Sequence, residues 1–309
     1  MNRLTRRQFL KAGAALGAGA ALDRTALAGE AATGRPRSVL AAVQGSDHEA
    51  MVRKAFDLLG GLKRFIQPGA RVVVKPNESF ANAPEWGNNT RPEVAAAVCK
   101  LCREAGARRV VVVDYPLMRG AEAPVLNGVQ PACEAVAGTR MRVLQQEHQF
   151  RGIPVPRGKA LRQVAVSRDV LDADLVINLP VAKAHDAVAV SIALKNLMGV
   201  IWDRSSFHTM MDINQAIADL SSAVRPGLTL VDMTRVLLTN GPKGPGEVGE
   251  PNLVVASTDP VAADAFCLRK ARFNGRKIKP KQVRYLRIAH EMGLGEIDRK
   301  KLDLREASV

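Results

Sequence analysis

The stretch from residue 71 to residue 114 predicts the fold class most clearly, because it holds two runs of branched apolar residues around one helical segment. The runs are RVVVKPN at 71–77 and RVVVVD at 109–114, and TRPEVAAAVCKLCREAG at 90–106 lies between them. Apolar runs without polar alternation are typical of parallel strands that are buried on both faces. Strand, helix and strand in this order predict one βαβ unit of a parallel sheet.

The helical segment carries its own start and stop signals. Thr90 is expected to be the N-cap, with Glu93 closing a capping box and Pro92 in the first turn. Gly106 follows the last apolar residue, as a helix stop does. We therefore expect a helix from Thr90 to Ala105.

The same alternation continues along the chain and predicts an α/β fold, a mostly parallel sheet with helices on both faces, in a single domain at 29–309. The stretch around 115–165 is less regular, with scattered Pro, Gly and Arg, and predicts an insertion or a small subdomain. Further strands are expected at 38–43, 141–144, 175–178, 228–231 and 253–256, and helices at 49–59, 188–198, 212–224, 261–271 and 281–292.

The N-terminus reads as an export signal. Twin arginines at 6 and 7 precede a mildly apolar stretch at 12–22, and a small-x-small cleavage site lies at 26–28. Residues 1–28 are therefore predicted to be a twin-arginine signal peptide, with the twin-arginine translocase as a partner and a periplasmic or other extracytoplasmic location. An uncleaved anchor and an ordinary amphipathic helix are the alternatives. Export of a folded chain favours a protein that loads its ligand before export.

The composition narrows the function classes. Apolar residues make up 47% and charged residues 24%, which excludes a disordered chain, a collagen-like chain and a coiled coil. The net charge of +15 suits an anionic ligand, an anionic lipid or a wall polymer. Aromatic residues are only 4% and no nucleic-acid-binding motif stands out, so no nucleic-acid partner is expected. No apolar run after the first thirty residues is long enough to span a membrane.

Polar side chains follow several predicted strands at the point where each strand ends. Ligands of parallel α/β sheets bind beyond the carboxyl ends of strands, so we expect one shared crevice. Lysine suits phosphate or carboxylate, and asparagine both donates and accepts. The catalytic candidates are Lys183 and His185, the latter as the acid or base. The ligand-binding candidates are Lys75, Asn77, Lys195, Asn196, Asp232 and Asp259.

Several of these residues have other interpretations. Lys195 and Asn196 stand in an apolar, helix-like segment, and the alternative is that they point to solvent. His185, His208, Asp232 and Asp259 could form a mixed nitrogen and oxygen metal site, but their spacing matches no sharp metal motif. Asp259 before a proline also fits a helix N-cap.

The cysteines and one loop offer weaker signals. Cys99 and Cys102 lie in the middle of a predicted helix and favour packing, and the wide spacing of Cys133 and Cys267 argues against an iron–sulfur cluster. A periplasmic disulfide is an alternative. The Gly/Pro loop at 240–246 is either a lid or a plain turn, and it lacks the residues of a Walker loop. No Rossmann fingerprint follows a strand.

The motifs together resemble a known family, the domain of unknown function 362. The segments that carry the resemblance are VVVKPN at 72–77, TRPEV at 90–94, ADLVINLP at 173–180, ALKNLMGV at 193–200 and STDPVAAD at 257–264, with Lys183, His185 and Asp232. The resemblance covers roughly residues 38–270. Some members carry an added ferredoxin-like module, which this sequence lacks, so iron–sulfur chemistry is not implied. The resemblance implies that the residues at the family's motif positions are Lys75, Asn77, Lys183, His185, Lys195, Asn196 and Asp259.

The leading hypothesis is an exported enzyme that acts on an anionic small molecule or uses an anionic cofactor. A non-catalytic binding or maturation factor for an exported redox partner is the second hypothesis. The third is a metal-dependent enzyme, and the fourth is a basic wall-binding protein without a pocket. The sequence does not identify the cofactor.

Overall fold

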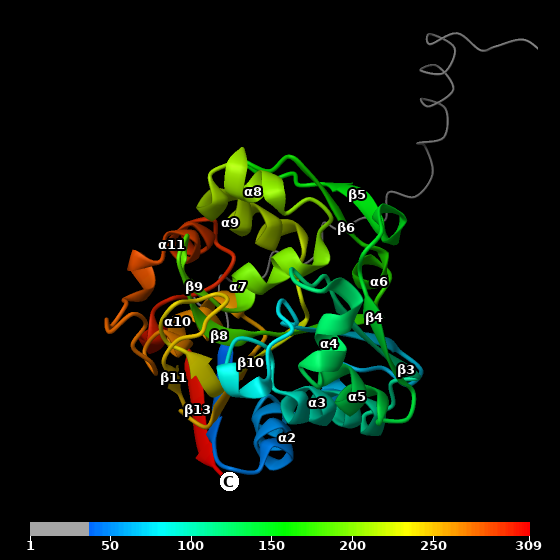
Figure 1. Ribbon diagram of the computed structural model, residues 1–309. Helices are drawn as coiled ribbons and strands as arrows, with labels where there is room; N and C mark the ends of the chain where they lie inside the picture. The colour runs from blue at the N-terminus through cyan, green and yellow to red at the C-terminus, as the bar shows by residue number, and fades with distance from the viewer. Residues whose placement is uncertain (1–36) are drawn as a thin grey trace, which may run out of the picture. The chain divides into compact units, whose positions relative to one another are not determined.

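A mixed sheet of eleven strands runs through residues 37–309, the part of the chain that the computed structural model describes (Figure 1). The expected signal peptide at 1–28 lies outside the described residues. Residues 37–309 form one compact unit, and none of their helices is long and apolar enough to cross a membrane.

The strands are ordered β13-β1-β12-β10-β7-β2-β3-β4, and β8, β9 and β11 attach around β10. Neighbours from β10 to β4 are parallel, whereas β12 runs antiparallel to both β1 and β10. The bounds are β1 Val39–Gln44, β2 Arg71–Pro76, β3 Arg109–Asp114, β4 Thr139–Val143, β5 Phe150–Pro154, β6 Gln163–Ser167, β7 Leu175–Leu179, β8 Val181–His185, β9 Ala189–Ser191, β10 Leu228–Leu237, β11 Val248–Gly249, β12 Leu253–Ser257 and β13 Asp303–Ser308.

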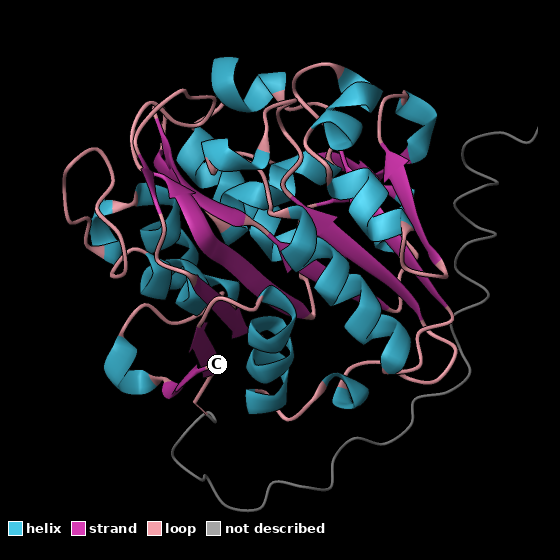
Figure 2. Cartoon of the chain, turned by 60° about the horizontal axis from the view of Figure 1, so that its bottom comes forward, coloured by secondary structure: helices cyan, strands magenta, loops and turns pink. Residues whose placement is uncertain are grey.

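Helices cover both faces of the sheet, as Figure 2 shows. Val72 and Val74 of β2 face the core under α2, α3 and α5, whereas Val73 faces the core under α7, α9, α10 and α11. The predicted α/β fold with a mostly parallel sheet is therefore confirmed. The helices are α2 His48–Leu58, α3 Pro92–Glu104, α4 Ala123–Leu126, α5 Val129–Glu134, α6 Arg168–Leu171, α7 Ala193–Asn196, α8 Ser205–Thr209, α9 Ile213–Ala223, α10 Pro260–Cys267 and α11 Arg284–Glu291.

The expected N-cap of α3 is wrong. Arg91 occupies the cap position, and its side chain makes no capping hydrogen bond to the helix. The buried Thr90 hydroxyl instead accepts from the Asn77 N–H and donates to the Leu179 carbonyl, each at 2.8 Å. Thr90 therefore ties the ends of β2 and β7 together, and the hydroxyl is no longer free to cap. The expected stop at Gly106 is confirmed by its φ of 102°.

The prediction of one helix at 188–198 is also wrong, because this segment forms β9, the short α7 and a 3-10 turn at Leu197–Val200. Short apolar runs suit a buried strand as well as a helix. The buried Asp264 carboxylate accepts from the N–H groups of Ala193, at 2.7 Å, and Leu194, at 3.3 Å. These two bonds hold the start of α7 after the strand.

The irregular stretch at 115–165 is only partly an insertion. Its helices α4 and α5 lead into β4, which pairs with β3 and extends the main sheet. The antiparallel pair β5 and β6 alone forms a separate two-stranded sheet among the described residues. The strand expected at 141–144 is therefore present as β4, and what the sequence pattern does not indicate are the helices α4 and α5 before it.

The four cysteines are free, buried and divided between the two faces of the sheet. Cys99, Cys102 and Cys133 belong to the core under α3 and α5, whereas Cys267 belongs to the core on the other face. Because the sheet separates them, the four thiols do not form one set of ligands.

The arrangement of β7, β8 and β10 determines where the polar residues of β8 lie. Strand β10 pairs with β7 at Leu228 and with β8 at Asp232 and Leu237, so it continues beyond the end of β7. Residues of β8 therefore stand beyond the carboxyl edge of the central strands. Strand β12 runs the opposite way, and its carboxyl end lies at the other edge of the sheet.

Candidate functional site

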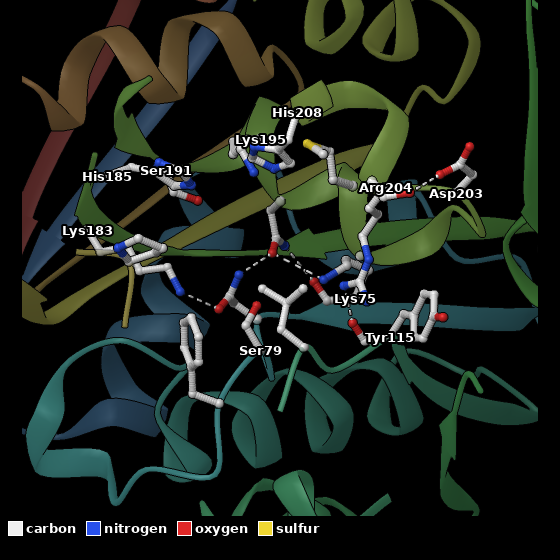
Figure 3. A pocket seen from close by; sticks show the side chains of 18 of the residues that line it. Lys75, Ser79, Tyr115, Lys183, His185, Ser191, Lys195, Asp203, Arg204 and His208 are labelled. Carbon is white, nitrogen blue, oxygen red and sulfur yellow. Dashed lines mark hydrogen bonds between the residues drawn. The ribbon is translucent and has the colours of Figure 1, made fainter. Parts of the chain in front are cut away.

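A cavity of about 510 Å³ opens beyond the carboxyl ends of β2 and β3 (Figure 3). Its lining comes from five parts of the chain: the ends of β2 and β3 with the residues that follow them, the β8–β9 hairpin, the α7 segment, residues 198–208 and the loop at 240–246. His208, a metal candidate in the sequence, also lines it. The expected catalytic and ligand-binding residues that line it are Lys75, Asn77, Lys183, His185, Lys195 and Asn196.

The first half of the site is the pocket floor, defined as Lys75, Asn77, Asp114, Asn178 and Asn196. The Lys75 ammonium lies 2.7 Å from Asp114 Oδ1, and each side chain is only 1% exposed. Lys75 Nζ also donates to Asn196 Oδ1, at 3.1 Å, and to the carbonyl of the next residue. Burial lowers the pKa of Lys75, and the Asp114 carboxylate opposes that shift. This ion pair is fully enclosed.

Three side-chain amides complete the floor. Asn77 Nδ2 donates to Asn196 Oδ1 at 2.9 Å, and Asn196 Nδ2 donates to Asn178 Oδ1 at 2.8 Å. Asn178 Nδ2 donates to the Ala193 carbonyl at 2.9 Å. Because buried networks with all partners present are rigid, the floor fixes α7 against the ends of β2 and β7. Asn196 is thus buried in the site and does not point to solvent.

The second half is the pocket wall, defined as Lys183, His185, Lys195, Arg204 and His208. Lys183 Nζ donates to Asn77 Oδ1, at 2.7 Å, and lies 5.0 Å from the centre of the Phe80 ring. It also donates to a backbone carbonyl at residue 88, at 2.5 Å, and pairs with no described carboxylate. Burial, with Lys195 as the next cause, lowers the pKa of Lys183 to about 7.

Lys195 and Arg204 add two more cations to the wall. The Lys195 ammonium has no hydrogen-bond or ion-pair partner among residues 37–309, and burial followed by Arg204 lowers its pKa to about 8. The Arg204 guanidinium lies 3.9 Å from the centre of the Tyr115 ring and donates to the Tyr115 carbonyl at 2.5 Å. Trp202 stacks parallel to Tyr115 with ring centres 5.8 Å apart.

The two histidines of the wall stack on each other, with ring centres 6.5 Å apart. Burial, with Lys195 as the next cause, lowers the pKa of His185 to about 3. His185 Nδ1 accepts from the Ala187 N–H at 3.2 Å. Burial also lowers the pKa of His208. His185 is therefore uncharged at neutral pH.

Asp232 and Asp259, which were expected in the same crevice, do not line it. Strand β10 does not end before Asp232, whose carboxylate accepts from the Arg91 N–H at 2.8 Å and holds the start of α3. Asp259 follows the antiparallel β12, so it lies at the opposite edge. There it caps α10 by accepting from the Ala262 N–H at 2.9 Å.

The four expected metal candidates are consequently divided. His185 and His208 line the cavity, and the two aspartates lie outside it. Among the described residues, no three His, Cys, Asp or Glu side chains come close enough to hold one metal ion.

Some lining residues have no signal in the sequence. Tyr115 directly follows the strand-end residue Asp114, but Trp202 and Arg204 come from a connection with no recognisable motif. Ser191, inside the segment expected to be helical, lines the cavity from β9.

The Gly/Pro loop at 240–246 forms part of the rim, where Pro242 lines the cavity. A Cβ at Gly241 would lie 1.8 Å from the Ala184 carbonyl oxygen, so glycine permits this close approach to β8. Asn88 Nδ2 donates to the Lys243 carbonyl at 2.7 Å and fixes the loop.

Comparison with known proteins identifies two regions of the chain. Residues 72–269 match the family described as "Domain of unknown function (DUF362)", a shorter span than the 38–270 expected. Residues 3–22 match the twin-arginine translocation pathway signal sequence, which indicates export through that translocase to an extracytoplasmic location.

One curated relative is a protein of Synechocystis sp. named "Thylakoid-associated protein". It is 30% identical over 224 residues, which are 70% of this chain and 67% of the relative. Among solved structures, the lactate racemase apoprotein of Thermoanaerobacterium thermosaccharolyticum aligns with 12% identity and a TM-score of 0.46. A Thermotoga maritima protein aligns with 10% identity and a TM-score of 0.42. The alignments cover 73% and 80% of this chain, but only 55% and 59% of those chains.

Proposed function

This chain belongs to the DUF362 family, and we propose that it is an exported, periplasmic enzyme that binds an anionic small molecule, as substrate or cofactor, in the pocket described above. One observation carries the proposal: Lys183, Lys195 and Arg204 line one cavity without a paired carboxylate. Asp203 is the one acidic residue among the described residues that line it, and it is exposed. A cavity with this excess of positive charge attracts anions.

The floor and the wall take different parts in this proposal. Lys75 is already neutralised by Asp114, so it orients the amides of Asn77 and Asn196 and adds little net attraction for a ligand. Lys183 and Lys195 meet the anion directly. A bound anion favours their charged forms, so binding takes up protons near neutral pH.

Lys183 is the proposed acid and base. Its pKa of about 7 lies near the operating pH, where proton transfer in both directions is most effective. His185 is uncharged in the empty pocket and accepts a proton more readily once an anion offsets the nearby lysine charges.

The test is thermal unfolding of the purified exported protein with oxalate or inorganic phosphate, followed by isothermal titration. We expect either anion to raise the melting temperature of the wild type and of Lys63→Met, which removes an exposed lysine. Lys183→Met should abolish most of the rise, and His185→Ala should remove turnover once a substrate is found. No stabilisation of the wild type by either anion would contradict the proposal.

A non-catalytic binding factor for an exported partner is the second candidate, and apolar exposure near the cavity favours it. Leu117, which lines the cavity, is 57% exposed, and Met210, just after α8, is 81% exposed. Exposed apolar side chains near a ligand pocket suit a protein partner. Stoichiometric binding without turnover would favour this function over catalysis.

A further inference from the structure

The three lysines that line the cavity differ in their partners. Lys75 is held by Asp114 and Asn196, and Lys183 by Asn77 and a backbone carbonyl. Lys195 has no such partner among the described residues, and its side chain lines the cavity and is only partly exposed. An ammonium that is partly withdrawn from water, has no acceptor and lies near the Arg204 cation is unfavourable, so the environment of Lys195 favours the free amine.

The groups that face Lys195 strengthen this difference. Arg204, Lys183 and the two histidines line the same cavity, and only the exposed Asp186 carboxylate opposes their effect on the amine. Figure 3 shows Lys195 beside His208, and the Lys195 charge contributes to the lowered pKa of that histidine. With a pKa of about 8, roughly one Lys195 side chain in ten is uncharged at pH 7. A desolvated lysine next to another cation is the usual form of a nucleophilic amine.

We propose that Lys195 is the nucleophile of this pocket and forms a Schiff base with a small anionic aldehyde or ketone, such as a 2-oxo acid. The inference rests on the proposed function, because Lys183 and Arg204 are needed to hold the carboxylate or phosphate of that molecule. It adds a substrate class, namely carbonyl compounds that carry an anionic group.

The step balances without an oxidant or a reductant. The neutral Lys195 amine attacks the carbonyl carbon, so that an N–C bond forms and the π electrons of the C=O bond move to the oxygen. The oxygen gains a proton and the nitrogen loses one, which gives a carbinolamine. The C–O bond then breaks, and the hydroxyl leaves with a second proton as water while the C=N bond forms. His185 and His208, which line the same cavity, carry these protons.

The test is reductive trapping with glyoxylate and sodium cyanoborohydride, followed by peptide mapping of the exported protein. The exposed Lys63 serves as an internal reference in the same sample. We expect Lys195 to be modified on the order of tenfold faster than Lys63, since more of it is uncharged. Lys195→Arg, which keeps the cation but cannot form the imine, should lose this adduct and keep the Lys63 adduct.

Oxalate, an anion without a reactive carbonyl, should slow modification of Lys195 and leave Lys63 unaffected. Equal rates at the two lysines would overturn the inference. If Lys195 is not trapped while oxalate still raises the melting temperature, the Schiff base alone is wrong and the anion pocket stands. If oxalate has no effect on melting either, both the inference and the proposed function are wrong.

Discussion

The floor and the wall of the pocket use the same residue type in opposite ways. Lys75 of the floor is enclosed with a carboxylate and an amide, whereas Lys195 of the wall has no partner among residues 37–309. Each lysine is followed closely by an asparagine and stands in a motif of the family. The partners of a lysine, and not its motif, therefore separate a structural cation from a reactive one.

The largest expected effect comes from breaking the floor. Asp114→Ala removes the partner of the buried Lys75 and also the acceptor for the N–H groups of Glu78, at 2.6 Å, and Tyr115, at 2.8 Å. Removing one member of a buried pair costs about 3–5 kcal/mol of the free energy of unfolding. Denaturant unfolding of the variant and the wild type measures this loss in the free energy of unfolding.

The matched control is Glu104→Ala, which breaks the exposed pair between Arg53 and Glu104. Exposed pairs contribute about 0–1 kcal/mol, so this variant should unfold almost as the wild type does. Equal losses in the two variants would show that the Lys75–Asp114 pair is not the structural half of the site.

The next effect is the pH dependence of the wall. Protonated Lys183 and Lys195 attract an anion, and their pKa values of about 7 and 8 mean that both lose charge as the pH rises from 6 to 9. Oxalate stays fully ionised over that range, so its affinity should fall by about tenfold or more, which is roughly 1.4 kcal/mol. Isothermal titration at several pH values measures it.

Lys195→Arg sharpens this result, because an arginine stays charged throughout the range. In that variant, the oxalate affinity should change less with pH in the upper part of the range. An oxalate affinity that does not change between pH 6 and pH 9 in the wild type would show that the wall lysines do not titrate as proposed.

The sequence predicted the fold and most of the pocket for a physical reason. Strand β2, which carries Lys75, runs parallel to β7, β10 and β8, and β8 carries Lys183, so the two side chains meet at one edge of the sheet. An apolar run such as LVVAS at 253–257 looks the same whether its strand runs parallel or antiparallel. The direction of β12 depends on long-range pairing, and it moves Asp259 to the other edge.

Other features depend on contacts between distant segments and leave no local pattern. The Thr90 hydroxyl does not cap α3, because it donates to the Leu179 carbonyl at the end of β7, the strand beside β2. Arg204 reaches the cavity from a connection with no recognisable motif, and its guanidinium lies over the ring of the distant Tyr115. Gly199 is needed because a Cβ there would lie 2.2 Å from Asp114 Oδ1, and nothing in the sequence near 199 indicates that aspartate.

The smallest expected effect is that of Asp259→Ala. This variant should lower the stability of the fold without weakening oxalate binding. The Asp259 carboxylate accepts from the N–H groups of Ala262 and Glu296, each at 2.9 Å, and from the Ser38 hydroxyl at 3.1 Å. Asp259→Ala should therefore lower the free energy of unfolding by about 1 kcal/mol, as loss of an N-cap does. Because Asp259 lies at the opposite edge from the wall, the oxalate affinity at pH 7 should stay within about twofold of the wild type, a change below roughly 0.5 kcal/mol. A larger fall in affinity, with the fold intact, would mean that this motif residue acts on the pocket and that floor and wall do not make up the whole site.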